Sequence, residues 1–306
     1  MVEPHSDRDP AATWLLVVAA GCALLVLVVH YVFVATTRGQ LVDSAALQGA
    51  QIGRQHIIGS VQRVLDVVSV GALAAAAILA GAVALLRRRV LLAGVAVVTV
   101  VGSNLTTQLL KHLLFQRPDL GLATQGVSEN TLPSGHTTVA MSVAAAAVLV
   151  APPRLRAVVA LVAAGYGAAT GVATLSAGYH RPSDAIAAAL VVGAWSAGLA
   201  ALAIVIAPQD EAPTDHASDE AAGHPYVASL LGGAAAVLLL VGALATYVTA
   251  RSLPGTLERA HLLLAYAGGA ALIAGTAFAV VAALVVVVHR IAPPLPQRTL
   301  LASGTG

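Results

Sequence analysis

Residues 133–152 read PSGHTTVAMSVAAAAVLVAP, and residues 180–207 read HRPSDAIAAALVVGAWSAGLAALAIVIA. Each stretch opens with a short polar motif and continues as a long run of alanine, valine and leucine. Apolar runs of about 20 residues are typical of membrane-spanning helices. The two polar motifs are therefore expected where a span meets the aqueous surface of a membrane.

The composition of the whole chain agrees with a membrane protein. Of its 306 residues, 58% are hydrophobic and 10% are charged, whereas about 25% are charged in a typical soluble domain. The formal net charge of +2 is too small to indicate a nucleic-acid partner. The single cysteine, Cys22, lies inside an apolar run and rules out a disulfide framework within the chain.

Eight apolar runs predict an all-α, polytopic membrane helix bundle, because lipid offers no hydrogen-bond partner to an open backbone. The acidic stretch 208–225 predicts a cytoplasmic linker. It would separate a six-span core, residues 1–207, from a two-span C-terminal appendix with its tail, residues 226–306. The predicted spans lie near 14–36, 66–86, 90–110, 137–152, 157–176, 185–207, 226–248 and 262–288.

Short basic loops predict how the chain is oriented in the cell membrane. Residues 87–89 are all arginine and join the second and third runs, and Arg154 and Arg156 join the fourth and fifth. Because short basic loops stay in the cytoplasm, both chain ends are expected inside. Both histidine motifs then lie on the extracytoplasmic face. The loops expected on that face are 37–65, 111–136, 177–184 and 249–261.

The first motif, Pro133 to His136, has the properties of a helix start. Ser134 is a good N-cap, and Pro133 and Gly135 interrupt the preceding chain. A helix start exposes unpaired N–H groups, which suit an anion. His136 stands in the first turn, where it can lend or take a proton near neutral pH. Taken singly, the motif is explained equally well as an ordinary helix entry with a surface histidine.

The second motif places Asp184 four residues after His180. This carboxylate can accept a hydrogen bond from one imidazole nitrogen and leave the other as a nucleophile. Asp184 can equally be explained as a residue that matches the helix dipole, with His180 as an interfacial anchor. A metal face of His136, His180 and Asp184 is a further alternative, less favoured because the site is rich in anion donors.

A third cluster lies at the outer end of the third run. Lys111 is the only lysine in the chain, and Arg117 is followed by a proline. Both cations are suited to holding phosphate oxygens through charge-assisted hydrogen bonds. The alternative is that both side chains reach from the lipid toward the headgroup region.

Together the three clusters resemble the type 2 phosphatidic acid phosphatase and vanadium haloperoxidase superfamily, in its membrane lipid phosphatase branch. That family carries Lys-x6-Arg-Pro, then Pro-Ser-Gly-His, then Ser-Arg-x5-His-x3-Asp. The second motif is complete at 133–136, and His180 and Asp184 reproduce the end of the third. The serine and arginine of the third motif fall on Ala173 and Thr174. The phosphate-binding guanidinium of the family is therefore missing from its usual place.

The first motif also departs from the family, because five residues rather than six separate Lys111 from Arg117. A helix end can absorb one residue by unwinding. For the missing guanidinium, either Arg117 is sufficient or Arg181 reaches back into the pocket from beside the nucleophile. The second possibility predicts that Arg181→Ala slows turnover far more than it affects folding.

The resemblance implies an integral-membrane hydrolase that removes phosphate from a lipid phosphate or diphosphate through a phosphohistidine. In that scheme His180 is the nucleophile, Asp184 orients it, and His136 acts as acid and then as base. The scheme needs no metal or other cofactor. Its partners are the lipid bilayer and a phosphorylated membrane lipid. The implied phosphate-binding residues are Lys111, Arg117, Ser134, Gly135 and Arg181.

Two other functions stay open at this point. A non-catalytic phospholipid-binding or lipid-translocating protein with a degenerate site would explain the threonine at position 174. A vanadate-dependent halide oxidiser is less favoured, because nothing in the chain indicates that chemistry. The patterns predict no particular lipid, no oligomeric state and no role for the last two spans.

Overall fold

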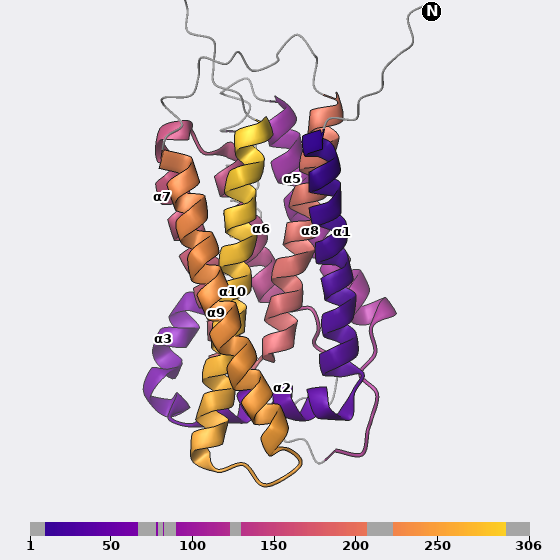
Figure 1. Ribbon diagram of the computed structural model, residues 1–306, viewed down its shortest axis with the longest axis vertical. Helices are drawn as coiled ribbons and strands as arrows, with labels where there is room; N and C mark the ends of the chain where they lie inside the picture. Colours follow the sequence, from indigo (N-terminus) through magenta and orange to yellow (C-terminus); the bar gives the residue numbers. More distant parts are fainter. Residues whose placement is uncertain are drawn as a thin grey trace, which may run out of the picture.

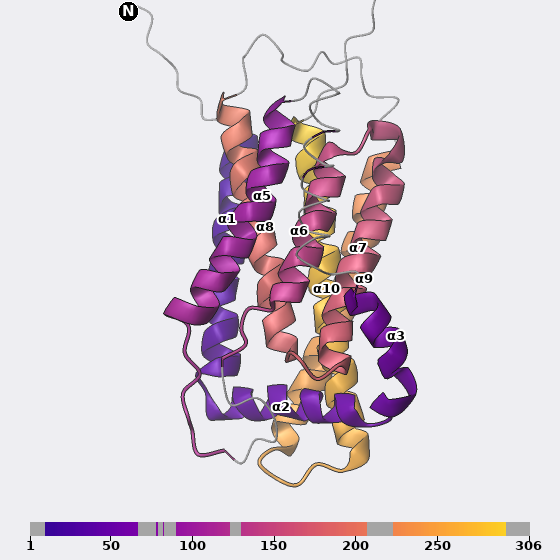
Figure 2. The same ribbon diagram turned by 180° about the vertical axis from the view of Figure 1, so that it is seen from behind.

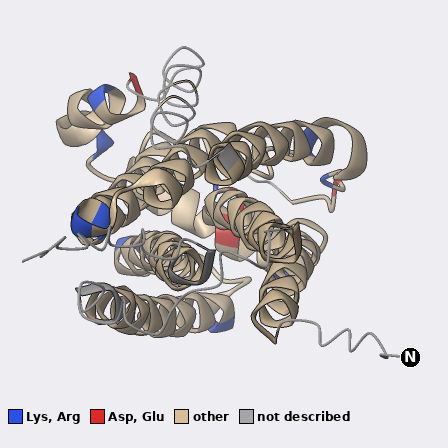
Figure 3. Cartoon of the chain, turned by 90° about the horizontal axis from the view of Figure 1, so that it is seen from above, with Lys and Arg blue, Asp and Glu red and all other residues tan. Residues whose placement is uncertain are grey.

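The computed structural model describes residues 10–66, 78, 82, 90–122, 130–206 and 223–291. This part of the chain consists of helices joined by turns and loops, and it contains no strand. Most helices run side by side along one axis (Figures 1 and 2). Seen along that axis, few positions on the ribbon are acidic or basic (Figure 3). The predicted all-α membrane bundle is confirmed.

Within the described residues, six helical segments are long and apolar enough to cross a membrane. Two of them finish in a π-helical turn. The helices that form these segments are α1 (Pro10–Val29, continued by η1, His30–Val34), α5 (Val90–Leu109, continued by η2, Leu110–Leu114), α7 (Pro153–Ser176), α8 (Pro182–Ile206), α9 (Gly223–Ser252) and α10 (Arg259–Ile291).

Two of the eight predicted spans are not among these six. The run at 137–152 forms α6 (Gly135–Val150), an apolar helix of 16 residues. Pro152 and Pro153 follow it, and proline cannot continue a helix interior but suits the first turn of the next helix. The run at 66–86 lies almost wholly outside the described residues.

The segment 37–65, which was expected to be an external loop, instead forms two helices, α2 (Thr37–Gln51) and α3 (Arg54–Asp66). Thr36 caps α2 by accepting the Gly39 N–H at 3.1 Å. Helix α2 lies across one end of the bundle, nearly perpendicular to the spans (Figure 2). The segment contains no long apolar run, so the sequence pattern did not predict α2. The buried residues of α2 contact other helices rather than lipid.

The last two helices differ in their burial. Helix α10 packs against α2, α7 and α8 as well as α9. In their most apolar windows, 61% of α10 is buried but only 17% of α9. Helix α10 therefore belongs to the interior of the bundle, and α9 covers its outside (Figure 1). The division into core, linker and appendix stays a prediction.

One close approach brings α10 to the start of α8. A Cβ atom added at Gly269 would lie 2.5 Å from the ring Cγ of Pro182. Only glycine permits this distance, as is common where membrane helices pack closely. The contact holds the first residue of α8 against α10, next to the second sequence motif.

Candidate active site

The first motif opens α6 as its residue types predict. The Ser134 hydroxyl oxygen accepts the Thr137 N–H at 3.3 Å and the Thr137 hydroxyl at 3.0 Å. A Cβ atom added at Gly135 would meet only the Gln108 amide nitrogen, at 3.9 Å, so space is open beside this residue. His136 follows and is exposed. The first turn of α6 thus presents backbone amides and an imidazole to an open volume.

The turn after α7 returns the chain to the second motif. Gly178 has φ of +75°, a conformation that residues with a Cβ rarely adopt. The Tyr179 N–H donates to the Thr174 carbonyl at 3.0 Å, and the Gly178 N–H donates to the Leu175 carbonyl at 2.9 Å. This is a Schellman motif, which ends a helix sharply. The His180 N–H also donates to the Thr174 carbonyl, at 3.3 Å, and this bond fixes the histidine beside the end of α7.

His180 and Asp184 form a buried pair. Nδ1 of His180 lies 3.1 Å from Oδ2 of Asp184, and the two residues are 8% and 2% exposed. The same carboxylate oxygen accepts the Arg181 N–H at 3.1 Å and the Thr131 hydroxyl at 2.5 Å. The carboxylate is thereby fixed by three residues. Because Nδ1 faces Asp184, Nε2 is the nitrogen of His180 that can act on a substrate.

The two histidines of the motifs lie at the same end of the bundle. Their ring centroids are 6.4 Å apart, and the ring planes meet at 64°. A backbone hydrogen bond of 2.9 Å from the Ser134 N–H to the Asp184 carbonyl joins the starts of α6 and α8. At this separation the two imidazoles can act on opposite sides of one small group.

The predicted cations surround this pair. Lys111, in η2, interacts electrostatically with Asp184 and His136. Arg117 follows η2 and is partly buried, and this burial, with the nearby Arg181 guanidinium, lowers its pKa. The one-residue difference from the family spacing falls in η2, where the span is not regular α-helix.

Arg181 is 2% exposed, and its Nη1 donates to the Thr131 hydroxyl at 3.5 Å. The Thr131 hydroxyl therefore links the Arg181 guanidinium to the Asp184 carboxylate. All eight predicted site residues are thus at one end of the bundle, and the individual roles given to them stay predictions. Thr174, at the place of the family arginine, is fully buried, and its hydroxyl donates to the Gly171 carbonyl at 2.7 Å.

Sequence reasoning missed the residues that hold the motifs together. The Asn130 amide donates to the carbonyls of Lys111, Phe115 and Leu132 at 3.1–3.2 Å. It thereby joins the end of the third apolar run to the loop before α6. Thr131, already described, is the second such residue. Their position just before a complete motif was the only available signal, since neither fits a spacing rule.

A large apolar cavity begins near the site. Its volume is about 680 Å³, and it lies between α1, α8, α9 and α10. Phe33 and Ile186 line the end that is closer to the start of α8, and Ala197 and Val287 line the other end. From Ile186 to Ala197 the cavity follows α8 for roughly 16 Å, at 1.5 Å per helical residue.

Across the described ranges, no group of three or more His, Cys, Asp and Glu side chains is arranged to hold a metal ion. The Asp184 oxygen nearest His180 is already engaged by the hydroxyl and amide donors described above.

Comparison with protein families agrees with this geometry. Residues 90–207, which contain all three motifs, match the model of the PAP2 superfamily. This match supports a phosphatase-like function in general. Neither the curated proteins nor the solved structures include a significant match to this chain.

Proposed function

We propose that the protein is an integral-membrane phosphatase that hydrolyses a lipid phosphate or diphosphate through a phosphohistidine intermediate. The observation that carries this proposal is the arrangement of two imidazoles, one bound to a buried carboxylate, with ring centroids 6.4 Å apart. Nucleophile, orienting carboxylate and proton donor are the three groups that such a reaction requires.

In the first step Nε2 of His180 attacks phosphorus, and the bond from phosphorus to the lipid oxygen breaks. His136 gives its proton to that oxygen, so the lipid leaves as an alcohol or a monophosphate. Asp184 holds the opposite side of the His180 ring and stabilises the positive charge that the ring acquires. The products of this step are the free lipid and a phosphorylated His180.

In the second step His136, now neutral, takes a proton from water. The water oxygen attacks phosphorus, the phosphorus–nitrogen bond breaks, and inorganic phosphate leaves. During both steps negative charge grows on the equatorial phosphoryl oxygens, and fixed donors are most effective there. The proposed donors are Lys111, Arg117, Arg181, the Ser134 hydroxyl and the Gly135 amide.

A lipid substrate is favoured by the surroundings of the site. The motifs open helices of a membrane bundle, so a phosphate headgroup can reach them while its hydrocarbon tail stays in the membrane. The apolar cavity between α1, α8, α9 and α10 has the length and lining suited to such a chain. Following the distribution of basic loops, we place the site on the extracytoplasmic face of the cell membrane.

The test is phosphate release by the purified protein in detergent. Phosphatidic acid, phosphatidylglycerophosphate and a polyprenyl diphosphate are offered in parallel to the wild type and to His180→Ala. We expect release from at least one lipid, inhibition by vanadate, and loss of release in the variant. A chelator should leave the rate unchanged. Equal release by wild type and His180→Ala would falsify the proposed nucleophile.

A second function is favoured by one observation, the threonine at position 174. A protein that binds or moves phospholipids without hydrolysing them would not need the missing arginine. In that case the wild type binds phosphorylated lipid in the same assay but releases no phosphate from any member of the panel. Because removal of one transition-state donor costs about 10²–10³ in rate, turnover in the ordinary enzymatic range would imply that another cation has taken its place.

A further inference from the structure

Asp43 is a buried carboxylate to which the proposed mechanism gives no role. It lies on α2, outside the segment that matches the PAP2 superfamily, and it is 1% exposed. Aspartate is almost never fully buried unless its charge is compensated by hydrogen bonds or a partner. The burial of the Asp43 carboxylate therefore requires a structural or functional explanation.

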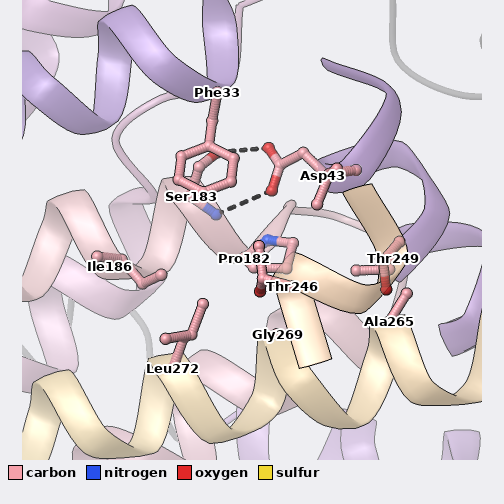
Figure 4. Close-up of a pocket in the computed structure, with 12 residues that line it drawn as sticks. Phe33, Asp43, Pro182, Ser183, Ile186, Thr246, Thr249, Ala265, Gly269 and Leu272 are labelled. Carbon is pink, nitrogen blue, oxygen red and sulfur yellow. Dashed lines mark hydrogen bonds between the residues drawn. The ribbon is translucent and has the colours of Figure 1, made fainter. Parts of the chain in front are cut away.

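Both oxygens of Asp43 accept hydrogen bonds from Ser183. Oδ1 accepts the Ser183 N–H at 3.2 Å, and Oδ2 accepts the Ser183 hydroxyl at 2.5 Å (Figure 4). Ser183 is the second residue of α8, where backbone N–H groups have no partner within the helix. Asp43 thus caps α8 from another helix, 140 positions earlier in the sequence.

Ser183 is the immediate neighbour of Asp184, and Arg181 lies two residues before it. Fixing Ser183 therefore fixes the first turn of α8, from which both active-site groups extend. One residue before Ser183, Pro182 is held against Gly269 of α10. Helices α2 and α10 thus hold this turn from two directions.

The charge of Asp43 also acts on the site. Burial and the nearby Asp184 carboxylate raise the pKa of Asp43 to about 7, against the Ser183 hydrogen bonds and the Arg181 guanidinium, which lower it. Arg117 interacts with the same two carboxylates. Asp43 is therefore part of one cluster in which two guanidinium groups of like charge are kept close together.

Asp43 has no space in which to bind a ligand of its own. The pocket beside it, lined by Phe33, Pro182 and Ile186 among others, has a volume of about 10 Å³ (Figure 4). That is at the lower limit for one water molecule. The carboxylate consequently acts through Ser183 and through its charge rather than by touching a substrate.

We propose that Asp43 is a positioning residue of the active site, which fixes Ser183 and so sets the first turn of α8 that presents Arg181 and Asp184. This inference rests on the proposed phosphatase function. It assigns to α2, outside the superfamily segment, a specific part in the reaction.

The test combines Asp43→Asn, Ser183→Ala and the double variant, with kinetics on the best lipid substrate. An asparagine cannot accept both Ser183 donors, so we expect kcat to fall about 10- to 100-fold, by analogy with lost positioning contacts, while KM changes less than threefold. Ser183→Ala removes the hydroxyl contact with Asp43 and keeps the backbone one. Because Asp43→Asn already disturbs both, the double variant should be no slower than Asp43→Asn. Thr249→Val, on α9 and in the same small pocket but not lining the large apolar cavity, is the matched control and should keep the wild-type kcat.

Thermal unfolding of each variant separates positioning from loss of fold. If Asp43→Asn does not fold, Ser183→Ala tests the same contact from the other side, and a wild-type kcat in Ser183→Ala would refute the inference. Fully additive losses in the double variant, or a wild-type kcat in folded Asp43→Asn, would refute it as well.

Binding of orthovanadate, a tetrahedral analogue of phosphate, distinguishes this inference from the phosphatase proposal. We expect Asp43→Asn to weaken vanadate binding at least tenfold. If the wild type binds vanadate but hydrolyses no lipid, and the variant loses that binding, the phosphatase proposal is wrong and the positioning role stands. If the variant binds vanadate as the wild type does, the positioning role is wrong.

Discussion

The superfamily segment, residues 90–207, and helix α2, residues 37–51, contribute to the candidate site in different ways. The segment supplies the groups suited to chemistry, namely two imidazoles, a carboxylate and three cations. Helix α2 supplies hydrogen bonds that hold those groups. Asp43 binds Ser183, and the Gln40 amide donates to the Pro118 carbonyl at 3.1 Å, next to Arg117.

This difference has a physical reason. A reaction needs particular functional groups at particular distances, whereas support needs only a donor or acceptor in the right place. Support can therefore come from a helix that is unrelated to the motif. The comparison predicts that variants of the reacting and phosphate-binding groups reduce turnover most, and that variants in the supporting contacts reduce it by smaller factors.

The largest effect is expected for Asp184→Asn. An amide at this position can donate to Nδ1 of His180, and it would then favour the wrong imidazole tautomer; the same change in a catalytic triad costs about 10⁴ in kcat. We expect a loss of 10³- to 10⁴-fold, measured as phosphate release under saturating lipid. Asp119→Asn, at an exposed carboxylate in the loop after η2, is the control and should leave the rate unchanged. More than a tenth of wild-type activity in Asp184→Asn would mean that His180 is not oriented by this carboxylate.

Arg181→Ala should have the next largest effect. If this guanidinium replaces the family arginine that is absent at Thr174, its removal costs about 10²–10³ in kcat. Arg154→Ala, which changes an exposed arginine at the start of α7, should retain full activity. The thermal unfolding midpoint must be measured for both, because Arg181 is buried. A folded Arg181→Ala protein with an unchanged kcat would leave Arg117 as the cation that replaces the missing arginine.

Thr131→Val tests a support contact inside the family region of the fold. The Thr131 hydroxyl donates to Asp184 and accepts from Arg181, so valine removes both bonds with little change in shape. We expect kcat to fall about tenfold, the equivalent of 1.4 kcal/mol, and Thr131→Ser to restore most of it. Failure of serine to restore the rate would show that the methyl group, not the hydroxyl, is what matters.

The spans and the site were predictable from the sequence to different extents. Long apolar runs such as 185–207 predict helices because lipid permits little else. The motif residues His136, His180 and Asp184 could be brought together because each opens an apolar run at the same membrane face. The run at 137–152 predicted the length of α6, which has 16 residues, and placed it two residues too late in the chain.

The supporting residues could not be predicted for a definite reason. Helix α2 has no long apolar run, and Asp43 acquires its partner only when α8 packs against it. Asn130 and Thr131 lie in a loop, where no helical period relates them to Lys111 or Asp184. Contacts of this kind follow from tertiary packing, which local spacing does not encode.

A smaller effect, on KM rather than kcat, is expected for a substitution in the apolar cavity, whose outer wall is formed by α9. Ala243→Phe should narrow it and raise KM severalfold for long-chain lipid phosphates, since one misfitting apolar contact is worth about 1–3 kcal/mol. Turnover of a water-soluble phosphate monoester should not change. Val237→Phe, on the same helix but not lining the cavity, is the matched control. If Ala243→Phe changed KM equally for long-chain and water-soluble substrates, the cavity would not be the binding site of the lipid chain.

The smallest effect concerns stability rather than turnover. It tests whether burial of the Asp43 carboxylate lowers the free energy of unfolding as pH rises. The pKa of Asp43 is raised from 3.8 to about 7 in the folded protein. Between these values the folded state binds more protons than the unfolded state, so the free energy of unfolding falls as pH rises. The contribution is fully present below pH 3.8 and is lost as pH passes about 7.

Asp43→Asn removes this titration while other groups still titrate. Unfolding of wild type and variant in detergent, compared from pH 4.5 to 8, should therefore show a steeper decline for the wild type. Parallel curves would mean that Asp43 keeps an ordinary pKa and that its burial carries no electrostatic cost.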